Sequence, residues 1–237
     1  MKQRRLIYFL NGVGWFILLL ALLMGRVRDV ARDPGLYLKL QKQAGVHETA
    51  GVSNAELVQL DVNIANYLMG KYDDPNLEIE VQGQMQPAFN ERELQHLADC
   101  RRLFAPTVSL WLNIGMAVVG VGLIMLSRER MITKGSLAAL CTASAVIVLP
   151  LATLGIWAAV DFDAAFAFFH RLLFTNDLWM LNPETDLLIR LCPASMFAAM
   201  GLRIAWQSAL ILLGVPALAG IGYYVEKKRK TNESAEL

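Results

Sequence analysis

The sequence has few cysteines and no excess of charge of either sign, and both features narrow the class of protein. Its 237 residues contain three cysteines and no C-x-x-C pair, so neither a zinc ribbon nor a dithiol redox motif is present. Lys and Arg number 22 against 21 Asp and Glu. The net charge of +1 provides no basic surface, so no nucleic-acid partner is predicted.

The common catalytic motifs are also missing. No G-x-S-x-G or H-E-x-x-H motif occurs, which argues against an α/β-hydrolase and against a zinc protease. No glycine-rich phosphate or dinucleotide loop follows a strand, and the histidine–four–aspartate signature of glycerolipid acyltransferases is absent. We therefore predict no cofactor and no bound metal. An enzyme with this sequence would rely on histidine and carboxylate side chains, without a covalent nucleophile.

Long apolar runs are what the sequence has in abundance. Hydrophobic residues make up 55% of the chain and charged residues 18%, and the mean hydropathy is +0.40, values typical of a multi-pass membrane protein. A bilayer core requires about 20 apolar residues per helix, and the four runs 6–25, 108–126, 137–160 and 204–225 fit. The first run has no small-residue cleavage site, so we interpret it as a retained span and not as a signal peptide. Glycines at 12–14 and 115–122 lie inside spans, where small residues let helices approach closely.

Basic residues near the spans predict the topology. Lys2, Arg4 and Arg5 precede the first run, "SRERMITK" joins the second and third, and "EKKRK" follows the fourth. Because basic clusters favour the cytoplasm, these three parts are predicted to lie there. The chain then divides into a span at 1–25, an extracytoplasmic segment at 26–107, a span at 108–126, a cytoplasmic loop at 127–136, a span at 137–160, an extracytoplasmic amphipathic segment at 161–203, a span at 204–225 and a cytoplasmic tail at 226–237.

The two outer segments are predicted to form a helical cap. In the first, Ser53 or Asn54 caps a helix with apolar residues at helical spacing, and a weak alternation at 77–81 suits a strand or hairpin arm. Asn90 and Glu93 make a capping-box pattern before the next helix. The second segment suits broken amphipathic helices along the membrane interface. The fold class is thus an all-α membrane protein with four transmembrane helices, an extracytoplasmic helical cap and a short β-hairpin. A disulfide between Cys100 and Cys192, both outside, remains an open alternative.

His96 is the first candidate for chemistry. His96, Asp99, Cys100 and Leu103 fall at i, i+3, i+4 and i+7 on one stripe of the predicted helix, so Asp99 is expected within reach of the imidazole, where it would fix the tautomer and raise the basicity. The alternative is an exposed histidine–aspartate pair just before a membrane span. His47 lies in a polar loop and is predicted to be solvated.

His170 is the second candidate. It lies with Phe162, Phe166, Phe169 and Leu173 on the stripe of a helix that we expect to face the membrane, and Asp161 is the predicted cap of that helix. An ionisable ring among aromatic residues is costly without a partner, and ionisable groups at membrane depth are functional candidates. The alternative is an interfacial histidine that is bonded to a backbone carbonyl or a lipid headgroup.

Two blocks of the sequence resemble a known family. They are "FNERELQHLADCRRLF" at 89–104 and "VDFDAAFAFFHRLLFTNDLWMLNPETDLLIRLCP" at 160–193. The second combines Asp-Phe, Phe-x-x-Phe-His, Asn-Asp-x-Trp and Asn-Pro-x-Thr-Asp in order after an apolar run. These blocks are similar to the lipoprotein intramolecular transacylases, which are bacterial integral membrane proteins. The similarity extends over the chain and is weak at 26–80.

The resemblance implies an enzyme of the cell membrane with its active site on the extracytoplasmic side. Its substrate would be a diacylglyceryl lipoprotein in the phospholipid bilayer, and its reaction would move the sn-2 acyl chain to the α-amino group of the same N-terminal cysteine. It would make His96 and His170 catalytic. Supporting roles would fall to matched polar positions: Asp99, Asp161, Asn176, Asp177 and Asp186.

Two other functions remain open on the residues alone. One is a metal-dependent membrane hydrolase with zinc on His96, His170 and Asp161. The other is a non-enzymatic membrane sensor or interaction protein, with the histidines as a pH switch. The sequence carries no signal for the oligomeric state.

Overall fold

The computed structural model describes residues 2–81, 83–127 and 133–235. The chain forms two compact units. The first comprises residues 1–26, 110–153 and 205–237, and the second comprises residues 27–109 and 154–204. Each is described separately below.

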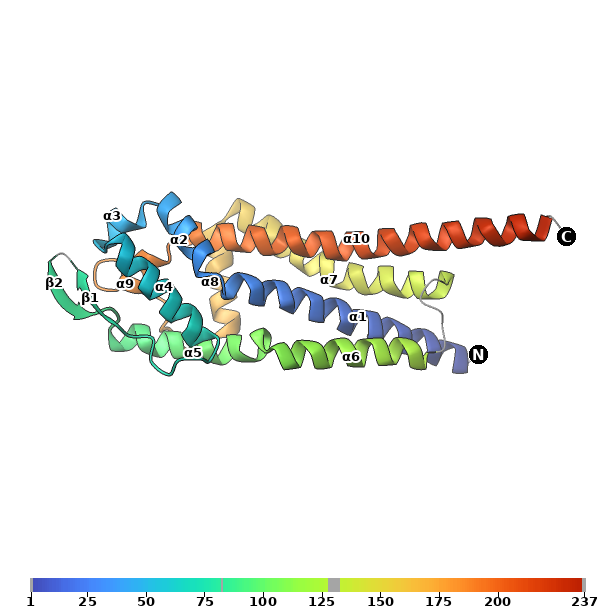
Figure 1. Ribbon diagram of the computed structural model, residues 1–237, viewed down its shortest axis with the longest axis horizontal. Helices are drawn as coiled ribbons and strands as arrows, with labels where there is room; N and C mark the ends of the chain where they lie inside the picture. The colour runs from blue at the N-terminus through green and yellow to red at the C-terminus, as the bar shows by residue number, and fades with distance from the viewer. Residues whose placement is uncertain (1, 82, 128–132, 236–237) are drawn as a thin grey trace. The chain divides into compact units, whose positions relative to one another are not determined.

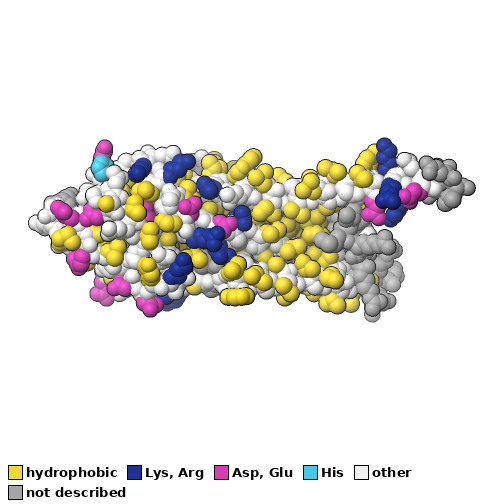
Figure 2. All heavy atoms as spheres, in the orientation of Figure 1, with side chains coloured by type: hydrophobic (Ala, Val, Ile, Leu, Met, Phe, Trp, Pro, Cys, Tyr) yellow, Lys and Arg dark blue, Asp and Glu magenta, His cyan; other side chains and the backbone are white. Residues whose placement is uncertain are grey.

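The first unit is built from long apolar helices. They are α1 (Lys2–Ala31), α6 (Leu110–Leu126), α7 (Lys134–Val160) and α10 (Ala194–Ala235), of which α1, α7 and α10 continue into the second unit (Figure 1). Among the described residues, four helices are long and apolar enough to cross a membrane. Many hydrophobic side chains lie on the visible surface along the middle of these helices, and Lys, Arg, Asp and Glu side chains gather near the C-terminal end (Figure 2). The predicted four-span helical fold class is thereby confirmed.

The second of these helices combines an apolar and a charged half. It runs from Glu91 to Leu126 through α5 (Glu91–Val108) and α6. The sequence of α6 contains no charged residue, whereas α5 carries six: Glu91, Arg92, Glu93, Asp99, Arg101 and Arg102. Because charged side chains are costly in hydrocarbon, we infer that α6 is the span and that α5 lies outside it.

Close backbone packing holds α1 against α6. A Cβ atom added at Gly14 would lie 2.7 Å from the carbonyl oxygen of Gly120, and one at Gly120 would lie 2.8 Å from that of Gly14. Only glycine lets the backbones of α1 and α6 come this close. This agrees with the prediction that glycines within the spans allow helices to approach closely. Buried polar side chains are paired nearby: Asn11 Nδ2 donates to Ser127 Oγ at 3.1 Å, and Trp15 Nε1 donates to Ser136 Oγ at 3.1 Å.

The second unit contains short helices and one hairpin. Its elements besides α5 are α2 (Pro34–Gln43), α3 (Val46–Ala50), α4 (Asn54–Leu68), β1 (Glu78–Val81), β2 (Gln84–Pro87), α8 (Phe162–Leu173) and α9 (Leu187–Leu191). Ser53 caps α4 with a full capping box to Glu56, and Asn90 and Glu93 form the expected reciprocal pair at the start of α5. Strands β1 and β2 pair antiparallel, with Ile79 opposite Gln86. The predicted hairpin is thus present.

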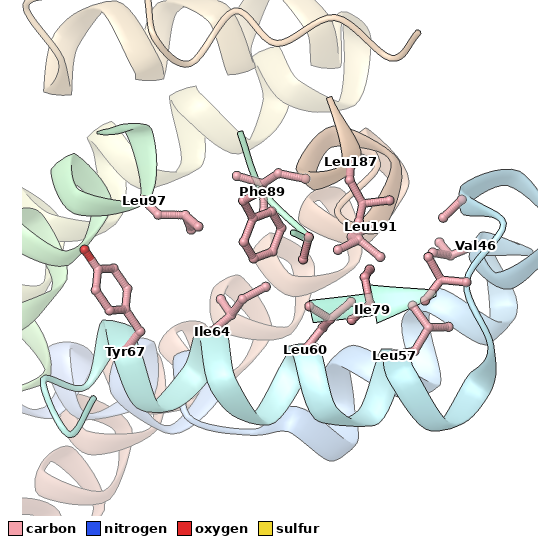
Figure 3. Packing of buried hydrophobic residues seen from close by; sticks show 14 of the residues in the cluster. Val46, Leu57, Leu60, Ile64, Tyr67, Ile79, Phe89, Leu97, Leu187 and Leu191 are labelled. Carbon is pink, nitrogen blue, oxygen red and sulfur yellow. The ribbon is translucent and has the colours of Figure 1, made fainter. Parts of the chain in front are cut away.

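One hydrophobic core joins both predicted outer segments. Leu57, Leu60 and Ile64 of α4 pack with Ile79 of β1 and Phe89 (Figure 3). The later segment contributes to the same cluster through α9: Leu187, Leu188 and Leu191. Burial of these aliphatic side chains, each worth roughly 1.5–3 kcal/mol, fixes α9 on the earlier segment. The disulfide left open from the sequence is not formed, since Cys100, Cys141 and Cys192 are all free.

Candidate active site

The two candidate histidines lie side by side in the second unit. His96 comes from the middle of α5 and His170 from the last turn of α8. Their ring centroids are 6.2 Å apart with an interplanar angle of 38°. Each residue is 8% exposed. Segments that are far apart in sequence therefore place two imidazoles in one largely water-free position.

Aromatic rings enclose His170. The Phe166 ring centroid lies 4.0 Å from that of His170, the Trp179 ring stacks at 4.9 Å, and the Phe174 ring stacks at 5.6 Å. Phe174 also meets His96 edge-on at 5.2 Å. The predicted membrane-facing stripe is therefore wrong for His170, which is buried inside the unit.

The outward side of α8 is formed by other residues. Phe169 is 45% exposed and Leu172 is 70% exposed, whereas Ala165 and His170 are buried. The helix begins as predicted, because the Asp161 side chain accepts a hydrogen bond from Ala164 N at 3.0 Å. The sequence pattern could not distinguish the two sides of α8, because both carry phenylalanine.

The hydrogen bond of His170 defines its tautomer. Its Nδ1 lies 2.8 Å from the carbonyl oxygen of Phe166, and since a carbonyl only accepts, Nδ1 carries the proton. The Nε2 atom of the neutral ring is then a free base. Burial lowers the pKa of His170 and outweighs the opposing effect of the Phe166 hydrogen bond, so the ring is neutral at pH 7.

His96 has a different partner from the one predicted. Its Nε2 lies 3.6 Å from Cys100 Sγ, and its buried Nδ1 has no hydrogen-bond partner among the described residues. Burial, followed by the neighbouring His170, lowers its pKa to about 4, against a raising effect of Asp99. Asp99 therefore raises the basicity of His96 as predicted, but the prediction that it fixes the tautomer is wrong, because neither ring nitrogen bonds to it among the described residues. His96 is a neutral ring at pH 7.

Asp99 instead links α5 to the loop after α8. It accepts a hydrogen bond from Asn176 Nδ2 at 2.8 Å and forms an ion pair with Arg102 at 2.8 Å. Asn176 Oδ1 in turn accepts from Leu178 N at 3.1 Å. Asp99 and Asn176 thus position the loop that carries Trp179.

The other predicted supporting residues bind backbone or side chains around the site. Asp186 accepts from Asn90 Nδ2 and from Asn182 N, each at 2.8 Å. The Asp177 side chain is exposed, and its carbonyl oxygen accepts from Arg92. Glu93, which is 1% exposed, accepts from Leu188 N at 2.6 Å. These bonds join α5 to the segment between α8 and α9.

The described residues do not support a zinc site. Within 2–81, 83–127 and 133–235, no three His, Cys, Asp or Glu side chains are placed so as to hold a metal ion. His47 lies exposed on α3.

Several residues around the two histidines were not predicted from the sequence to belong to the site. They are Cys100, Arg92, Phe174 and Trp179. The i+4 spacing of Cys100 from His96 was the one available signal. The others belong to segments whose approach to α5 depends on tertiary packing.

The fold defines a multi-pass helical membrane protein, and its buried imidazole pair suits proton transfer. The chain belongs to the family of the lipoprotein intramolecular transacylase Lit, whose family profile matches residues 13–197. This membership confirms the resemblance seen in the sequence and makes the chain a membrane-bound acyltransferase that acts on lipoprotein.

Solved structures share the fold. The membrane-integral Lit of Bacillus cereus is 21% identical, with a TM-score of 0.69 over 97% of this chain and 99% of that chain. Two further structures of the same protein carry a replaced histidine, by arginine in one and by alanine in the other. Both are 22% identical with TM-scores of 0.64, and they cover 97% of this chain and 95% and 96% of theirs. A comparison with curated protein sequences finds no match.

Proposed function

We propose that this enzyme moves the sn-2 acyl chain of a diacylglyceryl lipoprotein to the α-amino group of the same N-terminal cysteine. The new bond joins the amine nitrogen to the acyl carbon, and the bond from that carbon to the sn-2 oxygen breaks. One proton passes from nitrogen to the departing oxygen. The product is a lyso-form lipoprotein with the same atoms as the substrate.

The observation that carries this proposal is the pair of neutral imidazoles with centroids 6.2 Å apart. Amine and ester belong to one molecule, so fixed geometry replaces much of what a covalent nucleophile contributes, with effective molarities of about 10⁵ M or more. What the reaction still needs is proton transfer at two atoms, the amine and the alcohol oxygen. Two tunable imidazoles suit this task, at roughly 10²- to 10⁴-fold each.

His170 is the general base in this proposal. The α-ammonium of the substrate has an ordinary pKa of about 7.7–8.0 and releases one proton to water before it attacks. Because Phe166 O holds the Nδ1 proton of His170, the ring presents an unprotonated Nε2 to the attacking amine. As the nitrogen–carbon bond forms, Nε2 takes the second proton from nitrogen and passes it to the departing sn-2 oxygen.

His96 is the partner that stabilises the oxyanion. As the ester carbonyl becomes tetrahedral, its oxygen gains negative charge and needs a hydrogen-bond donor. The unpartnered Nδ1 of His96 meets that need when it carries the ring proton. Asn176 is less suited, since its amide is bonded to Asp99 and Leu178.

The surroundings favour acyl transfer over hydrolysis. Both imidazoles are 8% exposed and lie among Phe166, Phe174 and Trp179, so few water molecules reach the acyl carbon. Exposed apolar residues on α8, including Phe169 and Leu172, suit contact with acyl chains at the outer leaflet. The basic clusters at 2–5, 127–134 and 226–230 support a cytoplasmic location for those parts and hence an extracytoplasmic site.

Single substitutions test the proposal. We expect His96→Ala and His170→Ala each to abolish conversion, while His47→Ala, on the exposed face of α3, converts normally. Because the reaction leaves the mass unchanged, the readout is the fragment spectrum of the N-terminal lipopeptide together with loss of its free α-amine. Full conversion by either active-site variant, purified and folded, would refute the proposed chemistry.

A further inference from the structure

The thiol of Cys100 contacts the imidazole of His96. The two residues lie one turn apart on α5, and Sγ is 3.6 Å from Nε2, within the range of a sulfur hydrogen bond. Both are largely enclosed: His96 is 8% exposed, and Cys100 packs against the hydrophobic core. The contact is thus partly buried, and each group is the other's hydrogen-bonding partner.

The thiol keeps its proton in this position. Burial, followed by the charge of Asp99, raises the pKa of Cys100 to about 12, against a small opposing effect of the local backbone. The pKa of His96 is about 4. At pH 7 a neutral S–H group therefore faces a neutral imidazole. The imidazole nitrogen is a good acceptor and the thiol sulfur a weak one, so S–H donates to Nε2.

The charged residues near His96 and Cys100 do not change the neutral state of the imidazole and the thiol. Asp99 and Arg92 act on His96 with opposite signs, and the uncharged His170 is its other titratable neighbour. Cys192, which interacts electrostatically with Cys100, is a second thiol whose pKa burial also raises to about 12. A proton is thus retained on sulfur over the working pH range.

We propose that Cys100 is a positioning residue that fixes the tautomer of His96, so that Nδ1–H points to the reacting ester oxygen. With Nε2 occupied by the thiol proton, the ring hydrogen must reside on Nδ1. That atom is buried and has no partner within the part of the chain that the structure describes, which leaves it to donate to the developing oxyanion. This role rests on the proposed acyl transfer, and it makes the two rings complementary. His96 donates through Nδ1, and His170 accepts through Nε2.

The tautomer is measured directly in the full-length protein. With ¹⁵N-labelled histidine in detergent micelles, long-range nitrogen–proton correlations report which ring nitrogen of His96 carries hydrogen, and His47→Ala and His170→Ala variants assign the signals. We expect hydrogen on Nδ1 in the wild type and in Cys100→Ser, whose hydroxyl also donates. In Cys100→Ala we expect a shift toward hydrogen on Nε2. Hydrogen on Nε2 in the wild type overturns the proposal, whatever the variants do.

Kinetics provide the second readout. Cys100→Ala should lower kcat by about 10- to 100-fold with KM little changed, the effect of losing an oriented oxyanion donor. Cys100→Ser should restore most of the rate, and Cys141→Ala, an exposed thiol on α7, should act as wild type. Full kcat in folded Cys100→Ala overturns the proposal. If the tautomer result holds but His96→Ala keeps full activity, the proposed function fails and not the thiol contact.

Discussion

The imidazoles of His96 and His170 face each other at 6.2 Å between ring centroids, and among the described residues neither is bonded to a carboxylate. A carboxylate partner would raise the basicity of each ring and favour its cation. Here a backbone carbonyl and a thiol take that place, so both rings stay neutral in an apolar enclosure. Two neutral rings can lie side by side without charge repulsion, and a neutral ring can donate one hydrogen bond and accept another.

The first prediction concerns the pH dependence of the rate. Burial lowers the pKa of His170, so this base stays unprotonated below the ordinary histidine value of about 6.5. The substrate ammonium, with a pKa of about 8, then controls the rate above the ordinary histidine value of about 6.5. The logarithm of kcat/KM should rise with a slope of one up to about pH 8 and level off. A second, steeper limb should appear only at pH values below the ordinary histidine value of about 6.5.

Initial rates from pH 5 to 9 on one short lipopeptide measure this profile. The pKa of about 4 for His96 means that its protonation does not contribute in this range. A slope of two that already begins near pH 7 would show that a histidine titrates at its ordinary value. That outcome would contradict the neutral pair.

The second prediction concerns the link between Asp99 and Asn176. Asn176→Ala removes the 2.8 Å hydrogen bond and should loosen the loop that holds Trp179 against His170. Misplacement by about 1 Å can cost up to about 100-fold in rate, and we expect a loss of about 10-fold in kcat. Thr175→Ala, the exposed neighbour in the same loop, should leave the rate unchanged.

An exchange of the two side chains separates geometry from charge. In the double variant Asp99→Asn/Asn176→Asp, the amide and the carboxylate change places, so the hydrogen bond can re-form in the opposite direction. Recovery of most of the activity lost in either single variant is expected. If the double variant is no better than the worse single variant, Asp99 acts through its charge at α5 and not through the loop.

Local features of the fold could be predicted from the sequence because they depend on neighbours in the chain. Ser53 and Asp161 cap their helices as expected, and the four apolar runs correspond to long helices. The i+3 and i+4 spacings predicted equally that Asp99 or Cys100 would be the partner of the His96 ring. Which of them bonds to the ring could not be predicted, because Asn176 comes from another segment of the chain and binds Asp99.

The third prediction compares two glycines of the membrane helices. Gly14→Ala adds a Cβ atom 2.7 Å from the Gly120 carbonyl oxygen, so α1 and α6 must separate, at a cost of about 1–3 kcal/mol. Gly115 has no atom within 4 Å of its added Cβ, so Gly115→Ala should be neutral or slightly stabilising because alanine favours helix. Thermal unfolding in detergent gives both values. Equal effects at the two positions would contradict the close α1–α6 packing.

The fourth prediction concerns a buried carboxyl group away from the histidines. Asp61 on α4 is 2% exposed, and its Oδ1 accepts from Gln41 Nε2 at 2.9 Å. Asp61 Oδ2 and Gln41 Oε1 are both buried without a partner among the described residues. Burial, opposed by the Gln41 bond, raises the pKa of Asp61 to about 7. If Asp61 is protonated on Oδ2, this hydroxyl can donate a hydrogen bond to Gln41 Oε1, and both oxygens then have a partner.

Asp61→Asn reproduces the protonated form and should stabilise the enzyme in a pH-dependent way. Below about pH 4, Asp61 is protonated in both folded and unfolded states, so the variant gains nothing. As the pH rises to about 7, the unfolded state loses the proton first, and the wild type alone loses stability. The gain from the variant should reach on the order of 4 kcal/mol above pH 7. Unfolding free energies in detergent at pH 4, 6 and 8 test this, with exposed Glu48→Gln as the control. At pH 4, Asp61→Ala should destabilise because Gln41 Nε2 loses one of its two acceptors and keeps only Leu191 O. A gain from Asp61→Asn that is the same at all three pH values would show that Asp61 is ionised throughout.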